Sequence, residues 1–213
     1  MLTHDLLAFA RAALPAPPAR VLEVGAGRGE LAEALSDAGY AITAIDPAAE
    51  PGGIVEQRSL IDVRGSFDAA VAVVSLHHVD PLEESCAHLA TLVPAGAPVV
   101  IDELDIGRYD DRAIQWWLGQ RQALGLGVPT HDHGEAGSEL DAAEIMDRLR
   151  VHIHPLERVY AALEPYFDLA RPVRGPYLHR WELRPSLHEV EVDLIASGLL
   201  PAVGARVIAT RKE

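Results

Sequence analysis

The sequence predicts an α/β fold in which a mostly parallel sheet carries helices on both faces. Three observations support this class: short apolar runs alternate with helical patterns, the runs are nearly continuous in apolar residues, and a glycine-rich turn links the first run to a helix. Strands of this kind are typical of a parallel sheet that is buried on both sides. The expected strands span 21–24, 41–45, 54–56, 69–74 and 98–102, and the expected helices between them span 29–38 and 81–93.

Less regular segments surround this central region. A short amphipathic helix is expected at 4–14. After Glu103 the alternation of strands and helices is lost for about fifty residues, a length that often marks a lid or a substrate-binding insertion. In and after that stretch we expect helices at 111–124, 139–150, 155–166 and 186–198, one or two strands within 167–183, and a last strand at 201–210.

Composition limits the kinds of partner and compartment. The formal net charge is −14, and the acidic residues are scattered along the chain. This net negative charge argues against a nucleic-acid partner, because nucleic acid binds to a basic protein surface. No apolar stretch approaches the roughly 20 residues of a membrane helix. Cys86 is the single cysteine, so it cannot form an internal disulfide, and a cytoplasmic location is expected. The composition is compatible with a small-molecule ligand, with an acyl-carrier-like partner and with a homodimer.

The glycine-rich turn lies in the stretch "VLEVGAGRGELAEAL", with Glu23 just ahead of Gly25, Gly27 and Gly29. A dinucleotide fingerprint has the spacing G-x-G-x-x-G, and here the third glycine comes one residue early. A carboxylate beside the turn would also repel a pyrophosphate, whereas it would favour a cationic ligand. S-adenosylmethionine has no phosphate and carries an ammonium and a sulfonium group. These positive groups would be attracted to the negative charge of Glu23.

Asp46 follows the second expected strand, 17 positions after Gly29. A carboxylate there can accept hydrogen bonds from both hydroxyl groups of a ribose, the role given to an acidic residue about 20 positions on in dinucleotide folds. The alternative is that Asp46 and Pro47 only start a turn.

Four motifs in order extend the comparison: "VLEVGAGRGELAEAL", "AIDP", "FDAAVAVVSLHHVDPLEES" and "LATLVPAGAPVVIDE". Together they resemble the class I S-adenosylmethionine-dependent methyltransferases, particularly the small-molecule group, over roughly residues 20–103. The resemblance implies a Rossmann-like, seven-stranded, mostly parallel sheet with an antiparallel last strand. The cofactor-binding residues that it implies are Glu23, Gly25, Ala26, Gly27, Asp46, Pro47, Ser59, Leu60, Ser75 and Leu76.

Within that resemblance we expect a single domain over 1–213. Residues 1–103 would mainly bind the cofactor, 104–185 would form an acceptor-binding insertion and lid, and 186–213 would add the final helix and strand. Glu23 and the glycines would face the methionine part of the cofactor, Asp46 the ribose, and Ser59 or Leu60 the adenine.

Methyl transfer is an in-line displacement at a sulfonium carbon, so an enzyme supplies alignment and, where needed, a base for the proton of the acceptor. His78 follows the fourth expected strand, at the edge where open α/β sheets bind ligands. His133 lies in "THDHGEAG". Both are candidate general bases, and packing beside the cofactor or use at the surface are the alternatives. The pairs His131/His133 and His152/His154 could line a pocket or bind a metal ion, although we expect no metal.

Further polar and aromatic residues could contribute to acceptor binding. Glu103 and Asp105, placed after the fifth expected strand, could bind a cationic acceptor or accept its proton, or they could be solvated in a loop. Of the adjacent Trp116 and Trp117, at most one would normally line a cavity while the other anchors its helix. Aromatic walls of a pocket, or ordinary core packing, are the two interpretations of Tyr109, Tyr177, His179 and Trp181.

The sequence therefore predicts an S-adenosylmethionine-dependent methyltransferase that methylates an oxygen or a nitrogen of a small molecule. One alternative is a protein that binds S-adenosylmethionine or S-adenosylhomocysteine without transferring the methyl group. A less favoured alternative is an NAD(P)-dependent oxidoreductase. Against it stand the glycine spacing, Glu23, and the absence of a Y-x-x-x-K pair, since Lys212 is the only lysine.

Overall fold

The computed structural model describes residues 4–127 and 142–213 of the chain. Its strands are β1 (Arg20–Val24), β2 (Ala41–Asp46), β3 (Val55–Gln57), β4 (Ala69–Val73), β5 (Pro98–Leu104), β6 (Phe167–Leu169), β7 (Val173–Gly175) and β8 (Gly204–Arg211). Its α-helices are α1 (His4–Ala13), α2 (Glu30–Asp37), α3 (Leu82–Leu92), α4 (Asp111–Ala123), α5 (Ala142–His152), α6 (Leu156–Leu163) and α7 (His188–Ala196). The 3₁₀ helices are η1 (Leu60–Asp62), η2 (Leu76–His78), η3 (Ile106–Arg108), η4 (Leu178–Arg180) and η5 (Pro185–Leu187).

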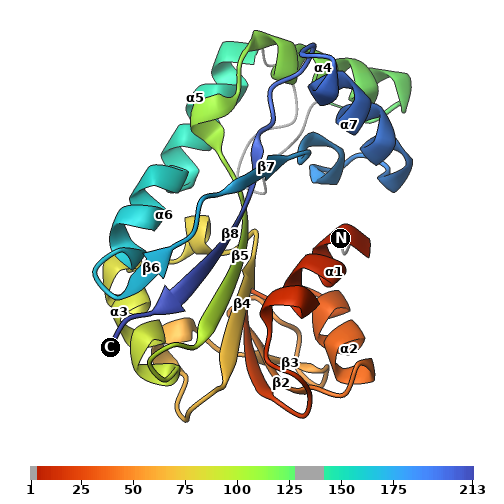
Figure 1. Cartoon of the computed structure of the whole chain (residues 1–213). Helices are drawn as coiled ribbons and strands as arrows, with labels where there is room; N and C mark the ends of the chain where they lie inside the picture. Colours follow the sequence, from red (N-terminus) through yellow and green to blue (C-terminus); the bar gives the residue numbers. More distant parts are fainter. Residues whose placement is uncertain (1–3, 128–141) are drawn as a thin grey trace. The chain divides into compact units, whose positions relative to one another are not determined.

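The described strands form one mixed sheet in the order β3-β2-β1-β4-β5-β8-β6, with β7 paired to β8 (Figure 1). The pairs β1 with β2, β1 with β4, β2 with β3 and β4 with β5 are parallel. The last strand, β8, lies between β5 and β6 and runs antiparallel to β6. The predicted α/β class, with a mostly parallel sheet and an antiparallel last strand, is confirmed, and β7 is an eighth strand beside the expected seven.

Both faces of the sheet are buried, as the nearly continuous apolar strands predicted. Leu22 of β1 belongs to a core cluster that also contains residues of α3 and α6. Its neighbour Val21 belongs to a second cluster, with residues of α1 and α2. Successive side chains of a strand point to opposite faces, so the central strands β1, β4 and β5 contribute to both clusters. Figure 1 shows α1 and α2 on one side of the strands and α3 and α6 on the other.

The chain divides into two compact units. The first contains the described residues of 1–103, 156–173 and 205–213, and it carries most of the sheet. The second contains the described residues of 104–155 and 174–204. Residues 156–173 group with the first unit because α6 packs on α3 within the same core cluster. None of the helices in 4–127 and 142–213 has both the length and the apolar character needed to cross a bilayer.

Candidate functional site

A cavity of about 480 Å³ lies in the first unit, where the parallel strands end. Val24 closes β1, Asp46 closes β2 and Val74 follows β4, and all three line the cavity. Open α/β sheets bind ligands outside the carboxyl ends of their strands. The volume lies within the range of about 300–1,000 Å³ that is typical of small-molecule sites.

The glycine turn, residues 25–29, forms one wall of this cavity through Gly25. Gly25 has a φ of +69°, and a Cβ atom there would lie 2.2 Å from the Cβ of Ser75. Gly27 has a φ of +54°, and an added Cβ would meet no protein atom within 4 Å. Gly25 is therefore required because Ser75, which follows β4, lies too close for a side chain. Gly27 leaves open space beside the backbone.

Asp46 has two roles in the geometry of the turn. Its Oδ2 accepts a hydrogen bond from the backbone N–H of Gly27 at 2.9 Å, and its Oδ1 accepts one from Ala48 at 2.8 Å. The hydrogen bond from Ala48 stabilises the turn that the alternative interpretation of Asp46 predicted. Because each carboxylate oxygen can accept more than one hydrogen bond, Asp46 can also accept bonds from a ligand in the cavity that it lines.

Glu23 is a buried carboxyl group on β1 with 3% of its surface exposed. Its Oε2 has no hydrogen-bond partner among the described residues. Burial raises the pKa of Glu23 from 4.5 to about 8, because the charged form loses its hydration. A buried polar atom without a partner is uncommon in folded proteins. A cationic ligand group beside Glu23 would supply the missing partner and would favour the charged carboxylate.

Glu103, on β5, supports the cavity wall at Ser75 from within the fold. Its Oε1 accepts hydrogen bonds from the backbone N–H groups of Ser75 at 3.0 Å and Leu76 at 2.7 Å, and its Oε2 lies 2.6 Å from Nδ1 of His77. The expectation that Glu103 is a solvated loop residue is wrong: the strand extends past it to Leu104, and the side chain is 1% exposed. We call this arrangement the Glu103 clamp, and it fixes η2 together with the residue before it.

The predicted cofactor residues divide into two groups. Those that line the cavity are Gly25, Asp46, Pro47, Ser59, Leu60 and Ser75. Glu23, Ala26, Gly27 and Leu76 are not among the lining residues, and Leu76 is fully buried in the core. Lining residues that the sequence did not suggest include Val24, Ile45, Arg58, Val74, Val79 and Asp80.

Val74 is the most unusual of these additional residues. It has a φ of +53°, a conformation that costs a β-branched residue about 1–3 kcal/mol. Its N–H donates to the carbonyl oxygen of Asp102 at 2.7 Å, which helps to hold this backbone conformation. Such strain is found preferentially at ligand-binding sites, but no sequence pattern marks it.

Of the two candidate bases, His78 and His133, the structure describes only His78. His78 lines the cavity and is exposed, and its ring lies 4.2 Å from that of His77, centroid to centroid. His133 lies outside the described residues, as does His131. No group of three or more potential metal ligands occurs in 4–127 and 142–213, which include His152 and His154.

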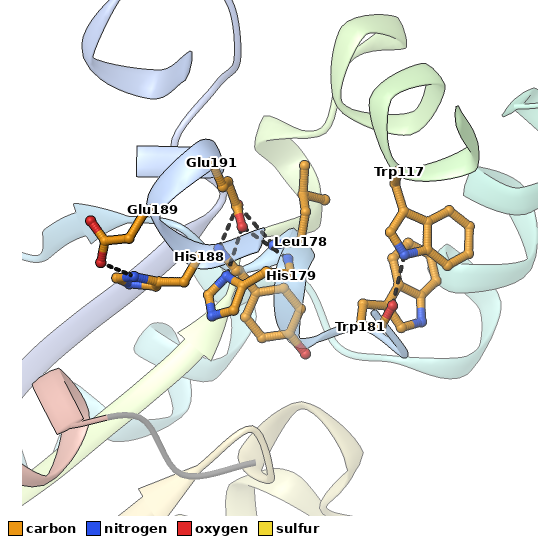
Figure 2. Close-up of polar contacts among 8 residues, drawn as sticks. Trp117, Leu178, His179, Trp181, His188, Glu189 and Glu191 are labelled. Atoms are coloured by element: carbon orange, nitrogen blue, oxygen red, sulfur yellow. Dashed lines mark hydrogen bonds and ion pairs between the residues drawn. The ribbon is translucent and has the colours of Figure 1, made fainter. Parts of the chain in front are cut away.

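Aromatic residues of the second unit pack against one another. The rings of Trp117 and Trp181 stack at 3.8 Å, and Nε1 of Trp117 donates to the carbonyl oxygen of Trp181 at 2.8 Å (Figure 2). Trp117 is fully buried and Trp116 is half-buried, so Trp117 is the member of the pair that anchors α4. Asp105 is paired with Arg174 at 2.6 Å and does not project as a solvated loop carboxylate.

A model of a methyltransferase-domain family matches residues 2–148 of the chain. The chain therefore belongs to this family, and the resemblance to the class I S-adenosylmethionine-dependent methyltransferases is confirmed.

Individual relatives agree with that assignment. An uncharacterized methyltransferase from Staphylococcus carnosus is 30% identical over 115 residues, or 47% of this chain and 56% of that protein. A ubiquinone biosynthesis O-methyltransferase from Xanthomonas campestris is 40% identical over 105 residues, or 41% of this chain and 43% of that protein. The chain thus spans about half the length of these curated relatives.

Solved structures share the fold. The 1,6-didemethyltoxoflavin-N1-methyltransferase of Burkholderia thailandensis, which contains S-adenosylhomocysteine, has a TM-score of 0.55 at 17% identity, with 99% of this chain and 78% of that chain covered. The N-methyltransferase NodS of Bradyrhizobium japonicum has a TM-score of 0.57 at 12% identity, with 98% and 86% covered. These similarities establish the Rossmann-like methyltransferase fold.

Proposed function

We propose that the protein transfers the methyl group of S-adenosylmethionine to an oxygen or a nitrogen atom of a small molecule. The observation that carries the proposal is the cavity at the ends of β1, β2 and β4, with Asp46 in its wall. On β1 lies the buried Glu23, whose Oε2 has no hydrogen-bond partner among the described residues. The names of the relatives from X. campestris and B. thailandensis, an O-methyltransferase and an N1-methyltransferase of small molecules, support this class of acceptor.

The residues of the cavity fit the parts of this cofactor. Asp46 would accept hydrogen bonds from the ribose hydroxyl groups, and Ser59 and Leu60 would lie against the adenine. The open space beside Gly27 would admit the methionine part, and Glu23 would balance its ammonium charge. When bound, the cofactor supplies a methyl group on a sulfonium, which is a good leaving group.

The chain itself must then orient the acceptor and accept its proton. His78 lies at the cavity and is one candidate for this role. His133 stays a prediction from the sequence. Water must also be excluded from the reacting groups, because a methyl acceptor competes with solvent.

Calorimetry with S-adenosylmethionine, S-adenosylhomocysteine and NADH tests the cofactor assignment. Binding of both sulfur compounds without binding of NADH is expected. NADH binding without a response to the sulfur compounds would contradict the proposal. Transfer of a labelled methyl group to the small-molecule fraction of a cell extract, with the product mass as readout, separates an enzyme from a protein that only binds the cofactor.

Asp46→Ala is expected to weaken S-adenosylmethionine binding by about 1–3 kcal/mol, because hydrogen bonds to a charged acceptor are lost. Part of this loss would come from the turn, since the variant also removes the acceptor for the Gly27 and Ala48 N–H groups. Calorimetry gives the dissociation constant. Glu50→Ala, which removes an exposed carboxylate outside the cavity lining, should leave it unchanged. An unaltered constant for Asp46→Ala would exclude the role in ribose binding.

Glu23 makes cofactor binding depend on pH. Below its raised pKa of about 8 the carboxyl group is mostly neutral, so a cationic ligand must displace its proton. Affinity should therefore rise from pH 6 to about pH 8, by up to about tenfold per pH unit, and then level off. Calorimetry in two buffers of different ionisation enthalpy would detect the proton released at pH 7. Glu23→Gln should remove both effects.

The raised pKa of Glu23 also makes the stability of the fold depend on pH, in the direction opposite to that of cofactor affinity. The unfolded chain loses the Glu23 proton near pH 4.5, whereas the folded chain holds it until about pH 8. Since the folded state then binds more protons, the free energy of unfolding falls as pH rises between these values. Glu23→Gln should be more stable than the natural protein at pH 8, measured by chemical denaturation, and nearly as stable at pH 4.5. Lower stability of the variant at pH 8 would show that the carboxylate has a partner.

A further inference from the structure

The cavity of the first unit is bordered by η1 and by the start of α3. Its lining residues there are Leu60, Ile61, Val79, Asp80 and Ser85, and we call this part the η1–α3 pocket. The two elements pack against each other, and Leu60 of η1 shares a core cluster with Leu82 and Cys86 of α3. All of these residues belong to the first unit.

The η1–α3 pocket has apolar walls and few polar groups. Leu60 is 5% exposed, and Ile61 and Val79 are half-buried. Sites for small molecules commonly combine such walls with a few polar groups that fix the orientation of the ligand. A flat heterocycle can pack its faces on these side chains and present the polar atoms of its edge to Asp80 and Ser85.

The proposed place of the ribose at Asp46 determines which part of the cofactor enters this pocket. The base and the methionine part are attached at different carbons of the ribose. The open space beside Gly27 and the carboxyl group of Glu23 suit the methionine part. The η1–α3 pocket is then left for the base.

Asp80 presents a carboxylate to the pocket. It is exposed and directly precedes Pro81, the residue at the amino-terminal cap of α3, where no side-chain hydrogen bond caps the helix. Among the hydrogen bonds and ion pairs of residues 4–127 and 142–213, none engages Asp80. A carboxylate can only accept hydrogen bonds, so Asp80 offers the pocket an acceptor that the fold does not use.

Ser85 presents a hydroxyl group from one turn further along the helix. Its backbone N–H donates to the carbonyl oxygen of Pro81 at 3.1 Å. The residue is 2% exposed and yet lines the cavity. Within the part of the chain that the structure describes, its hydroxyl group makes no hydrogen bond. A hydroxyl group can donate as well as accept, so Ser85 adds a donor near the acceptor of Asp80.

We propose that Asp80 and Ser85 recognise the edge of the adenine base of S-adenosylmethionine. The Asp80 carboxylate accepts a hydrogen bond from the 6-amino group, and the Ser85 hydroxyl donates to a ring nitrogen beside that group. The inference rests on the proposed function and adds two specificity-determining residues to it. Ser59 and Leu60 lie against the base, whereas Asp80 and Ser85 distinguish it from other purines.

The chemistry of the pair predicts rejection of a 6-oxopurine. Hypoxanthine carries a carbonyl oxygen in place of the amino group of adenine. That oxygen would face the Asp80 carboxylate, so that two acceptors would meet without a proton between them. A site that leaves buried polar groups unpaired with the wrong ligand discriminates strongly against it.

The first experiment compares two ligands on the natural protein. Calorimetry at neutral pH measures the dissociation constants of S-adenosylhomocysteine and of S-inosylhomocysteine, in which the carbonyl oxygen replaces the 6-amino group. We expect the inosine compound to bind about 10²-fold more weakly, since the contacts at Asp80 and Ser85 are both mismatched. Equal affinity for the two compounds would overturn the inference.

Asp80→Asn separates recognition of the base from a structural role. The Asn amide can accept from an amino group or donate to a carbonyl oxygen, so we expect the ratio of the two dissociation constants to fall to about tenfold or less. Asp62→Asn is the matched control, because Asp62 is an exposed acid on η1 outside the cavity lining, and it should keep the natural ratio. Loss of the ratio in Asp62→Asn but not in Asp80→Asn would contradict the proposal.

Ser85→Ala tests the donor. We expect S-adenosylhomocysteine to bind about tenfold more weakly, with the melting temperature nearly unchanged because alanine suits a helix. Ser36→Ala, which removes an exposed hydroxyl group from α2, should bind as the natural protein does. Natural affinity in Ser85→Ala would remove Ser85 from the proposal.

The ligand comparison also keeps the two levels of inference apart. If the natural protein binds neither sulfur compound, the proposed function fails. If it binds S-adenosylhomocysteine and S-inosylhomocysteine equally, the cofactor assignment stands and recognition of the base by Asp80 and Ser85 fails. Because this comparison needs no variant, poor folding of a variant does not affect it.

Discussion

Gly25→Ala is expected to destabilise the fold by about 3 kcal/mol and to abolish measurable cofactor binding. Two costs add: a left-handed backbone conformation costs an L-residue about 1–2 kcal/mol, and overpacking costs a further 1–3 kcal/mol or so. The overpacking is direct, because the new Cβ would lie 2.2 Å from the Cβ of Ser75. Chemical denaturation and calorimetry measure the two effects.

Gly27→Ala is the matched control for this prediction. Its φ of +54° imposes a similar backbone cost, but the added Cβ meets no protein atom within 4 Å. We expect a loss of only about 1–2 kcal/mol of stability, together with weaker cofactor binding because the methyl group occupies space beside the turn. Equal destabilisation by the two variants would show that contact with Ser75 is relieved by a small backbone shift.

Glu103→Ala is expected to destabilise the protein by about 3–5 kcal/mol, since removal of one partner leaves the others buried and unpaired. The N–H groups of Ser75 and Leu76 and the His77 ring would all lose their acceptor. Such a loss is a large part of the 5–15 kcal/mol that stabilises a typical domain. Thermal unfolding would therefore show a much lower midpoint, and S-adenosylmethionine binding would weaken as the cavity wall at Ser75 loosens.

Glu103→Gln provides the comparison. The amide oxygen can still accept from the two backbone N–H groups, and the amide nitrogen can donate to the other tautomer of His77. We expect a loss of about 1 kcal/mol. If Glu103→Ala were no less stable than Glu103→Gln, the clamp would contribute nothing to the fold, and another interaction would have to position the turn.

The sheet and part of the cavity lining could be predicted because their determinants are local. The central strands are mostly apolar runs, and Asp46 and the glycine turn lie at the ends of β2 and β1. Asp46 is an example: its place after an apolar strand indicated its position in the wall. Ser59 and Leu60, which the family resemblance implied, also line the cavity.

The Glu103 clamp and a similar arrangement around Glu191 of α7, the Glu191 clamp, could not be predicted because they join residues that are distant in sequence or that break the usual pattern. Glu103 reads as a polar residue after a strand, yet β5 continues past it and buries it. On α7 the expected order is reversed, since Glu191 is fully buried whereas its apolar neighbour Val190 is 45% exposed. The Glu191 carboxyl group accepts hydrogen bonds from the backbone N–H groups of residues 177–179, at the start of η4 (Figure 2). Only these contacts explain the inversion, and a 3₁₀ turn has no strong sequence pattern.

The clamps also set a rule for building chimeras from related enzymes. A loop graft that exchanges residues 75–78 or 177–180 removes the histidine ring and can shift the backbone N–H donors, but it leaves the carboxyl group behind in another element. Each turn and its glutamate must therefore be transplanted together as one cassette. Swaps that respect these pairings should give soluble hybrids, whereas swaps of the turn alone should yield protein that misfolds during expression.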